Sequence, residues 1–247
     1  MKISGFFKVL CPLLLFCILM VPEASGFGLP EKLVYDLTWT GITAGTATLD
    51  IAQDEDLVRI VSTARSASWV SVFYTVDDKI ETLLSRPTVS RNIGLPRHYR
   101  VKIREGRHRR DKEVFFNHGK GKALFEDHIA GEKKDIDIQE NTLDPLSGFY
   151  YLRTLKFEVG KSAFVEMLDN KKLWNVEVQV LRKERIQTKL GSFDTIVIKP
   201  LIKSEGIFNR RGDMYIWLTD DAKHLPVKMQ TKVAVGSVTA VLVGGEY

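Results

Sequence analysis

Alternation of apolar and polar residues is the feature that most constrains what this chain can fold into. It runs in short segments from Leu33 to Val243, and turns rich in glycine or charge separate the segments. Because successive side chains of a strand point to opposite faces, this pattern predicts half-buried β-strands. The first two segments, Leu33–Trp39 and Ala47–Ile51, flank the loop Gly41–Gly45 and predict an opening hairpin.

About a dozen such segments follow one another without the alternation of strands and helices that a parallel sheet needs. The pattern therefore predicts a mainly β protein built as an antiparallel meander. A sheet of this many strands, apolar on one face, curls to bury that face. We expect an incomplete or closed barrel.

One convincing helix interrupts the strands, at about Asp144–Leu155. Asp144 is a good N-cap, and Pro145 suits the first helical position. Apolar side chains surround the helix almost completely, so it must be covered on more than one side, and a curled sheet wrapped around it does this. Arg153 projects into an apolar face. If it meets a buried carboxylate, the helix is a fixed structural plug; if it points into an open cavity, it is a ligand contact.

Residues 1–26 have the pattern of a secretory signal peptide: early lysines, the apolar run Val9–Val21 and small residues before Phe27. This pattern predicts export of a single β-rich domain, residues 27–247, to the periplasm of a Gram-negative bacterium, free or associated with the outer membrane. Cys11 and Cys17 are the only cysteines and would leave with the signal, so no disulfide or cysteine site is expected. A net charge of +5 is too small to indicate nucleic-acid binding.

Four stretches together resemble a known family: Leu37–Gly45, Asp144–Arg153, Gly191–Ile196 and Trp217–Val227. From about Leu33 to Leu242 the chain resembles the exported bacterial proteins catalogued as "domain of unknown function 3108". The resemblance implies an envelope location and a β-rich fold, and it brings no activity or catalytic residue. The predicted architecture alone is also similar to that of the periplasmic lipoprotein carriers, whose incomplete barrel closes over a helical lid around an apolar cavity.

Several aromatic side chains and one arginine are candidate ligand contacts in a cavity beneath the helix. Barrel mouths are common pocket positions, although aromatic residues also dominate ordinary cores. The candidates are Trp69, Phe73, Tyr74, Phe149, Tyr150, Arg153 and Trp217.

The most charged segment, Arg97–Lys112, reads as a hairpin with Glu105-Gly106 as its turn, which brings like charges opposite one another. One interpretation is a solvated tip; the other is a docking patch for anionic lipid head groups or lipopolysaccharide phosphates, formed by Lys102, Arg104, Arg107 and Arg109.

No sequence motif points to a reaction. The chain lacks an H-E-x-x-H pair, a G-x-S-x-G elbow and a Gly-rich phosphate loop, so no catalytic residue, metal or cofactor is expected. We expect non-enzymatic binding of an amphipathic envelope molecule such as a lipid, with peripheral membrane contact and no prediction of oligomeric state. Two alternatives stay open: a glycan-active enzyme with a carboxylate pair, and an outer-membrane-associated structural or assembly factor.

Overall fold

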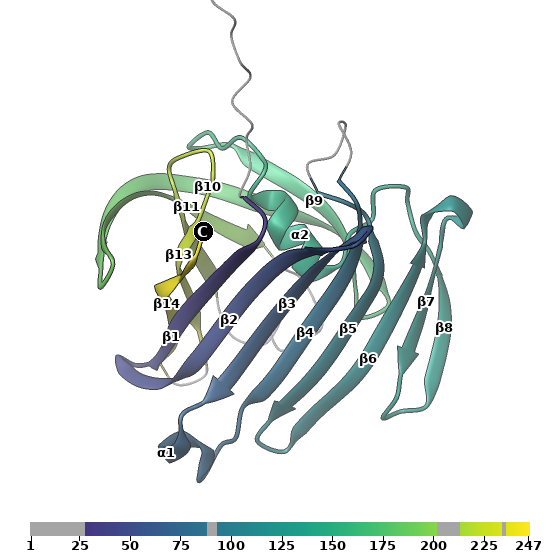
Figure 1. Ribbon diagram of the computed structural model, residues 1–247, viewed down its shortest axis with the longest axis horizontal. Coiled ribbons are helices and arrows are strands. Elements are labelled where there is room, and N and C mark those ends of the chain that lie inside the picture. The colour runs from purple at the N-terminus through teal and green to yellow at the C-terminus, as the bar shows by residue number, and fades with distance from the viewer. Residues whose placement is uncertain (1–27, 88–92, 202–212, 234–235) are drawn as a thin grey trace, which may run out of the picture.

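The computed structural model describes residues 28–87, 93–201, 213–233 and 236–247, so the predicted signal peptide lies outside the described residues. Fourteen strands form one sheet (Figure 1). Their bounds are β1 Glu31–Trp39, β2 Ile42–Asp54, β3 Leu57–Ser66, β4 Asp77–Ser85, β5 Pro96–Glu105, β6 His108–Asn117, β7 Lys122–Asp127, β8 Glu132–Asp137, β9 Ser162–Asp169, β10 Lys172–Thr188, β11 Gly191–Leu201, β12 Met214–Thr219, β13 Pro226–Lys232 and β14 Ser237–Glu246. The helical elements are α1 Ser68–Ser71, the 3-10 turn η1 His118–Lys120 and α2 Pro145–Leu152.

Every neighbouring pair of strands is antiparallel, which confirms the predicted meander. The order is β8-β7-β6-β5-β4-β3-β2-β1-β14-β13-β12-β11-β10-β9, so the first and last strands pair at the centre and β8 and β9 form the edges. The sheet curves strongly around α2 (Figure 1) but does not close into a hydrogen-bonded barrel. The incomplete form of the predicted barrel is the correct one.

The segment that leads into α2 covers the β9 edge. Leu143 donates its backbone N–H to Glu166 (3.1 Å) and accepts from the N–H of Leu168 (2.7 Å), in a parallel bridge. The buried Thr142 hydroxyl donates to the Glu166 carboxylate at 2.7 Å. This short stretch satisfies edge groups that would otherwise be free to pair with another chain.

Helix α2 begins where the sequence predicts and ends earlier. The Asp144 carboxylate accepts hydrogen bonds from the N–H groups of Leu146 (2.9 Å) and Ser147 (3.0 Å). The Asp144 N–H in turn donates to the Ser147 hydroxyl oxygen, which completes a capping box. The predicted end at Leu155 is wrong, because the helix stops at Leu152 and Arg153 is its C-cap. The following N–H groups bond three residues back, which tightens the chain into a turn.

The charged hairpin has a different register from the predicted one. Its turn is Gly106-Arg107 rather than Glu105-Gly106, because Glu105 pairs with His108. Gly106 has φ +54°, which suits a glycine at the first turn position. The shift places Lys102 opposite Asp111, an opposite charge, but leaves Arg104 opposite another arginine, Arg109, so one like-charge pair remains.

Candidate functional site

The concave face of the sheet is layered. A sealed apolar layer lies beside α2, where the inward side chains are buried: Tyr35, Leu49, Ile60, Thr82, Tyr99 and Val114. α2 packs against β3, β4 and β9 and adds the buried Leu146 and Tyr150 to the same cluster. The helix therefore fills one end of the curved sheet.

The next inward positions, toward the end of the sheet that carries α1, are apolar but only partly buried. They lie on β1, β2, β4 and β5, with Ser62 at the equivalent position of the intervening β3, and they pack against the sealed layer on one side: Leu37, Ala47, Ile80 and Val101. Ala47 lies opposite Ala64 on β3, and the flanking inward positions Gly45, Ser62 and Ser66 are also small. These residues form an apolar row that the described side chains do not seal.

Charged side chains follow at the last inward positions, where the curved sheet ends. The strand registers place Asp78 and Glu105 in phase with the apolar row, and Arg110 and Lys112 in phase with the buried Val114. Asp169 of β9 lies near both basic residues. We call these five residues the charged mouth.

Electrostatics at the charged mouth are tightly coupled. Burial raises the pKa of Asp78 and of Glu105, and the two carboxyl groups, which hydrogen-bond to each other, also repel as charges. Burial raises the pKa of Asp169, against the opposing effect of Arg110 and Lys112. Lys112 also donates to the Asn170 side-chain oxygen at 2.8 Å, which ties β6 to the β9–β10 turn. Groups of both signs thus surround the open end of the apolar row.

Arg153 is a structural residue. Its guanidinium donates two hydrogen bonds of 2.7 Å to the two carboxylate oxygens of Glu31, and both side chains are buried. It also donates to the backbone oxygens of His224 (3.1 Å) and Lys223 (3.3 Å). The guanidinium carbon lies 5.2 Å from the centre of the Tyr150 ring. A buried carboxylate is the partner that makes α2 a fixed plug.

The remaining sequence candidates divide into two groups. Phe149, Tyr150 and Trp217 lie in the interior clusters, Trp217 with Lys228 4.3 Å above its ring. The expectation that Trp69, Phe73 and Tyr74 lie beneath the helix is wrong, because they are 42%, 67% and 47% exposed on the segment around α1, at the opposite end of the sheet. A ligand role for these residues stays a prediction.

The four predicted basic residues all lie on the exposed part of the β5–β6 hairpin: Lys102, Arg104, Arg107 and Arg109. They do not line the concave face. Sequence reasoning missed Arg110 and Lys112, which are the basic residues of the charged mouth. The signal was present, because both share the alternation phase of the apolar Val114 and Phe116.

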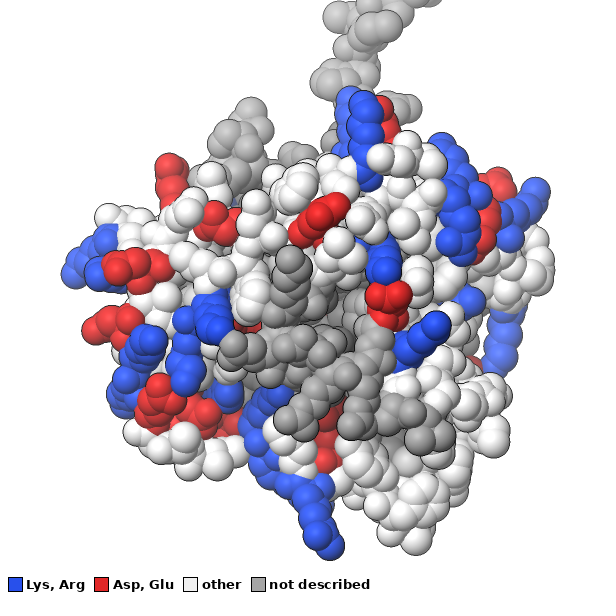
Figure 2. Space-filling view, turned by 180° about the vertical axis from the view of Figure 1, so that it is seen from behind, with Lys and Arg blue, Asp and Glu red and all other residues white. Residues whose placement is uncertain are grey.

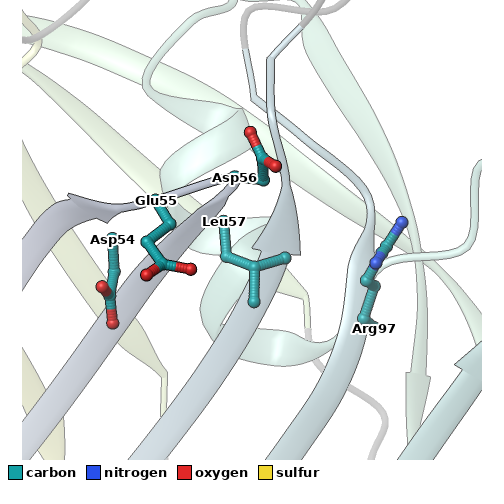
Figure 3. Close-up of a pocket in the computed structure, with 5 residues that line it drawn as sticks. All are labelled: Asp54, Glu55, Asp56, Leu57 and Arg97. Atoms are coloured by element: carbon teal, nitrogen blue, oxygen red, sulfur yellow. The ribbon is translucent and has the colours of Figure 1, made fainter.

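Two pockets formed mainly by charged residues lie elsewhere on the described surface. One, of about 500 Å³, is formed by the β2–β3 turn residues Asp54–Leu57 and by Arg97 of β5 (Figure 3). The other, of about 300 Å³, is lined by Lys79, Glu81, Arg100 and Lys102. Neither is the apolar cavity that the sequence predicts.

The described residues offer few features that indicate metal binding, catalysis or a membrane-spanning helix. No group of three or more His, Cys, Asp or Glu side chains there is arranged to hold a metal ion. Asp78 and Glu105 are in hydrogen-bonding contact, whereas the carboxylates of a glycosidase lie at least about 5 Å apart. None of the described helices has the length and apolar composition needed to cross a membrane.

Comparison with known families identifies the chain. The model of the family described as "Protein of unknown function (DUF3108)" matches residues 34–243. This protein belongs to that family. Among solved structures, the β-barrel-like protein of domain of unknown function DUF1849 from Brucella abortus is similar in fold. Its TM-score is 0.55 at 12% identity, over 88% of this chain and 97% of that one. No curated protein matches.

Proposed function

We propose that this DUF3108 protein is a non-enzymatic lipid-binding protein of the bacterial envelope. The observation that carries the proposal is the layered concave face, in which a partly exposed apolar row lies between a sealed core and a charged mouth. An amphipathic molecule has a matching arrangement, an apolar chain joined to a charged head group. Its acyl chain lies along Leu37, Ala47, Ile80 and Val101, and its head group lies at the mouth.

Two physical effects favour this placement. Covering apolar side chains removes them from water, at roughly 25 cal/mol per Å² of surface. The alanine pair Ala47 and Ala64 leaves room for a chain on β2 and β3. The ion pair of Arg153 with Glu31 fixes α2 in place. The end of the acyl chain would therefore contact a fixed helix rather than a movable lid.

The mixed charge of the mouth indicates the class of head group. Arg110 and Lys112 suit a phosphate, and Asp78, Glu105 and Asp169 suit an ammonium group. A zwitterionic phospholipid with an amine, of which lysophosphatidylethanolamine is the simplest single-chain form, therefore fits better than a purely anionic one. The leader pattern at residues 1–26 supports the envelope location.

The test is native mass spectrometry with lysophosphatidylethanolamine below its micelle-forming concentration. We expect a complex of one lipid per chain. Ala64→Phe places a ring in the apolar row and should abolish the complex. Val61→Phe is the matched control, because Val61 lies on the same strand and on its outer face, paired with Glu81.

Circular dichroism and thermal unfolding establish that both variants are folded. Lipid binding by wild type and Val61→Phe, with loss in folded Ala64→Phe, supports the proposal. The absence of any complex with wild type, or equal binding by Ala64→Phe and wild type, contradicts it. Replacement of both Arg110 and Lys112 by Gln should weaken binding of the phospholipid more than binding of a fatty alcohol, if the head group lies at the mouth.

A further inference from the structure

Exposed apolar side chains gather at one end of the sheet. In a meander, alternate connections lie at the same end, so the β1–β2, β3–β4, β5–β6 and β7–β8 connections lie together (Figure 1). The β3–β4 connection, residues 67–76, contains α1 and carries Val72, which is 85% exposed, and Phe73, which is 67% exposed. The other exposed apolar residues here are Trp39, Ile42, Trp69, Tyr74 and Ile129.

The α1 connection is held firmly on both sides. Toward the β1–β2 turn, the Trp69 indole donates to the Thr43 carbonyl at 3.1 Å. Toward the charged hairpin, the Gly106 N–H donates to the Thr75 carbonyl at 2.8 Å, and the Tyr74 ring lies directly against Gly106. The apolar connection and the β5–β6 turn therefore form one fixed surface, which we call the α1 end.

Free positive charge borders this apolar surface. In the part of the chain that the structure describes, the guanidinium groups of Arg104 and Arg107 make no ion pair or hydrogen bond, and Arg109 donates only to backbone oxygens in its own turn. The nearby exposed Asp77 faces Arg65 at 3.4 Å. In Figure 2 the area over the β1–β2 turn and α1, at the lower right, is largely uncharged, with basic side chains beside it at the bottom.

We propose that the α1 end docks on the surface of an anionic lipid bilayer. Val72 and Phe73 enter the interfacial region, Trp69 and Tyr74 lie at head-group level, and Arg104 and Arg107 contact lipid phosphates. A monomeric protein rarely presents such a patch to water. Two features favour a membrane over a protein partner: Trp and Tyr are typical of membrane interfaces, and unpaired arginines beside them match anionic lipid.

This docking surface rests on observations other than those that carry the proposed lipid binding. The two are related in space, because the charged mouth includes Glu105 and Asp78, which flank the same connections. A protein docked by the α1 end therefore presents its mouth to the bilayer. Vesicle flotation tests docking and native mass spectrometry tests lipid binding, so failure of one proposal is distinguishable from failure of the other.

The test is vesicle flotation of the protein without its leader, with phosphatidylglycerol/phosphatidylethanolamine vesicles compared with phosphatidylcholine vesicles. We expect binding to the anionic vesicles that weakens with salt. Val72→Ser/Phe73→Ser should weaken partitioning about tenfold or more, because two apolar side chains no longer leave water. Arg104→Ala/Arg107→Ala should weaken it about twentyfold at low salt. All four residues are exposed, so folding should be retained.

Matched controls lie away from the α1 end. Phe164→Ser removes an exposed phenylalanine from β9, and Arg182→Ala/Arg185→Ala removes two arginines from β10. Both should bind vesicles as wild type does. Brominated phospholipid should quench tryptophan fluorescence, and Trp69→Phe should reduce that quenching while Trp39, at the same end, retains part of it.

Three outcomes overturn the proposal. One is no flotation of wild type with anionic vesicles. The second is flotation that Val72→Ser/Phe73→Ser leaves unchanged. The third is self-association of wild type that this double variant abolishes while vesicles stay unbound, which would make the α1 end a protein interface.

Discussion

Replacement of Glu31 by Gln is the most informative single perturbation of the fold. The change keeps the size of the side chain and removes the negative charge that faces the buried Arg153 guanidinium. Arg153 then keeps its bonds to the backbone oxygens of Lys223 and His224. It loses the neutralising negative charge and one of its two 2.7 Å bonds, because the Gln amide offers one acceptor oxygen and its NH2 group cannot accept.

The size of the expected loss in folding stability follows from the burial of both side chains. Both side chains are almost fully buried, at 0% and 2% exposure, so solvent cannot replace the lost partner. Removing one partner of such a pair costs about 3–5 kcal/mol, and the remaining carbonyl acceptors place the cost of Glu31→Gln at about 3 kcal/mol. For a chain of this size, that corresponds to a fall in Tm of roughly 6–12 °C.

Urea unfolding, monitored by circular dichroism, measures the change in the free energy of unfolding. The same assay applied to Arg153→Met, Glu31→Leu and their combination forms a double-mutant cycle. The double variant removes both charges and leaves two carbonyl oxygens without a donor, so it should lose only about 1–2 kcal/mol, less than either single variant. A loss below about 1 kcal/mol for Glu31→Gln would refute the reasoning, as would strict additivity of the two single changes.

Three further predictions concern stability. Asp144→Ala should cost about 2–3 kcal/mol in urea unfolding, because it removes the capping box and leaves buried donors unpaired; a cost near zero would show that α2 needs no cap. The pKa of Glu105 is raised by burial and by Asp78, so the folded state holds its proton more tightly and stability falls as pH rises through that raised pKa. Glu105→Gln should therefore raise Tm at neutral pH but not in acid, and a rise of equal size in acid would contradict this. Gly106→Ala should lower Tm, because φ is +54° and the added carbon would lie 2.7 Å from the Tyr74 ring; an unchanged Tm would exclude that close contact.

Local physics made the strands and the start of α2 predictable from the sequence. The alternation around Tyr35, Leu49 and Val114 determines which face is buried, and the Asp144-Pro145 pair defines the helix start. The end of the helix was not predictable. The chain turns at Arg153, whose partner Glu31 lies 122 positions away in the sequence, so no local pattern marks it.

Long-range pairing and the position of α1 also escaped sequence analysis. The pairing of β1 with β14 joins the first and last strands, for example Leu37 with Ala240. The alternation pattern does not specify which strand pairs with β1 on its free side, so this contact was not predictable. Trp69 and Phe73 were expected in the interior because aromatic residues usually are. The loss of the two-residue period in this stretch was the only sign that they leave the sheet.

Native mass spectrometry of the protein isolated from its own cells, without detergent, tests the central claim most directly. The proposed function predicts one co-purified lipid per chain, which is absent from folded Ala64→Phe and present in Val61→Phe. A wild-type protein that carries no lipid, or carries a sugar in its place, would contradict it.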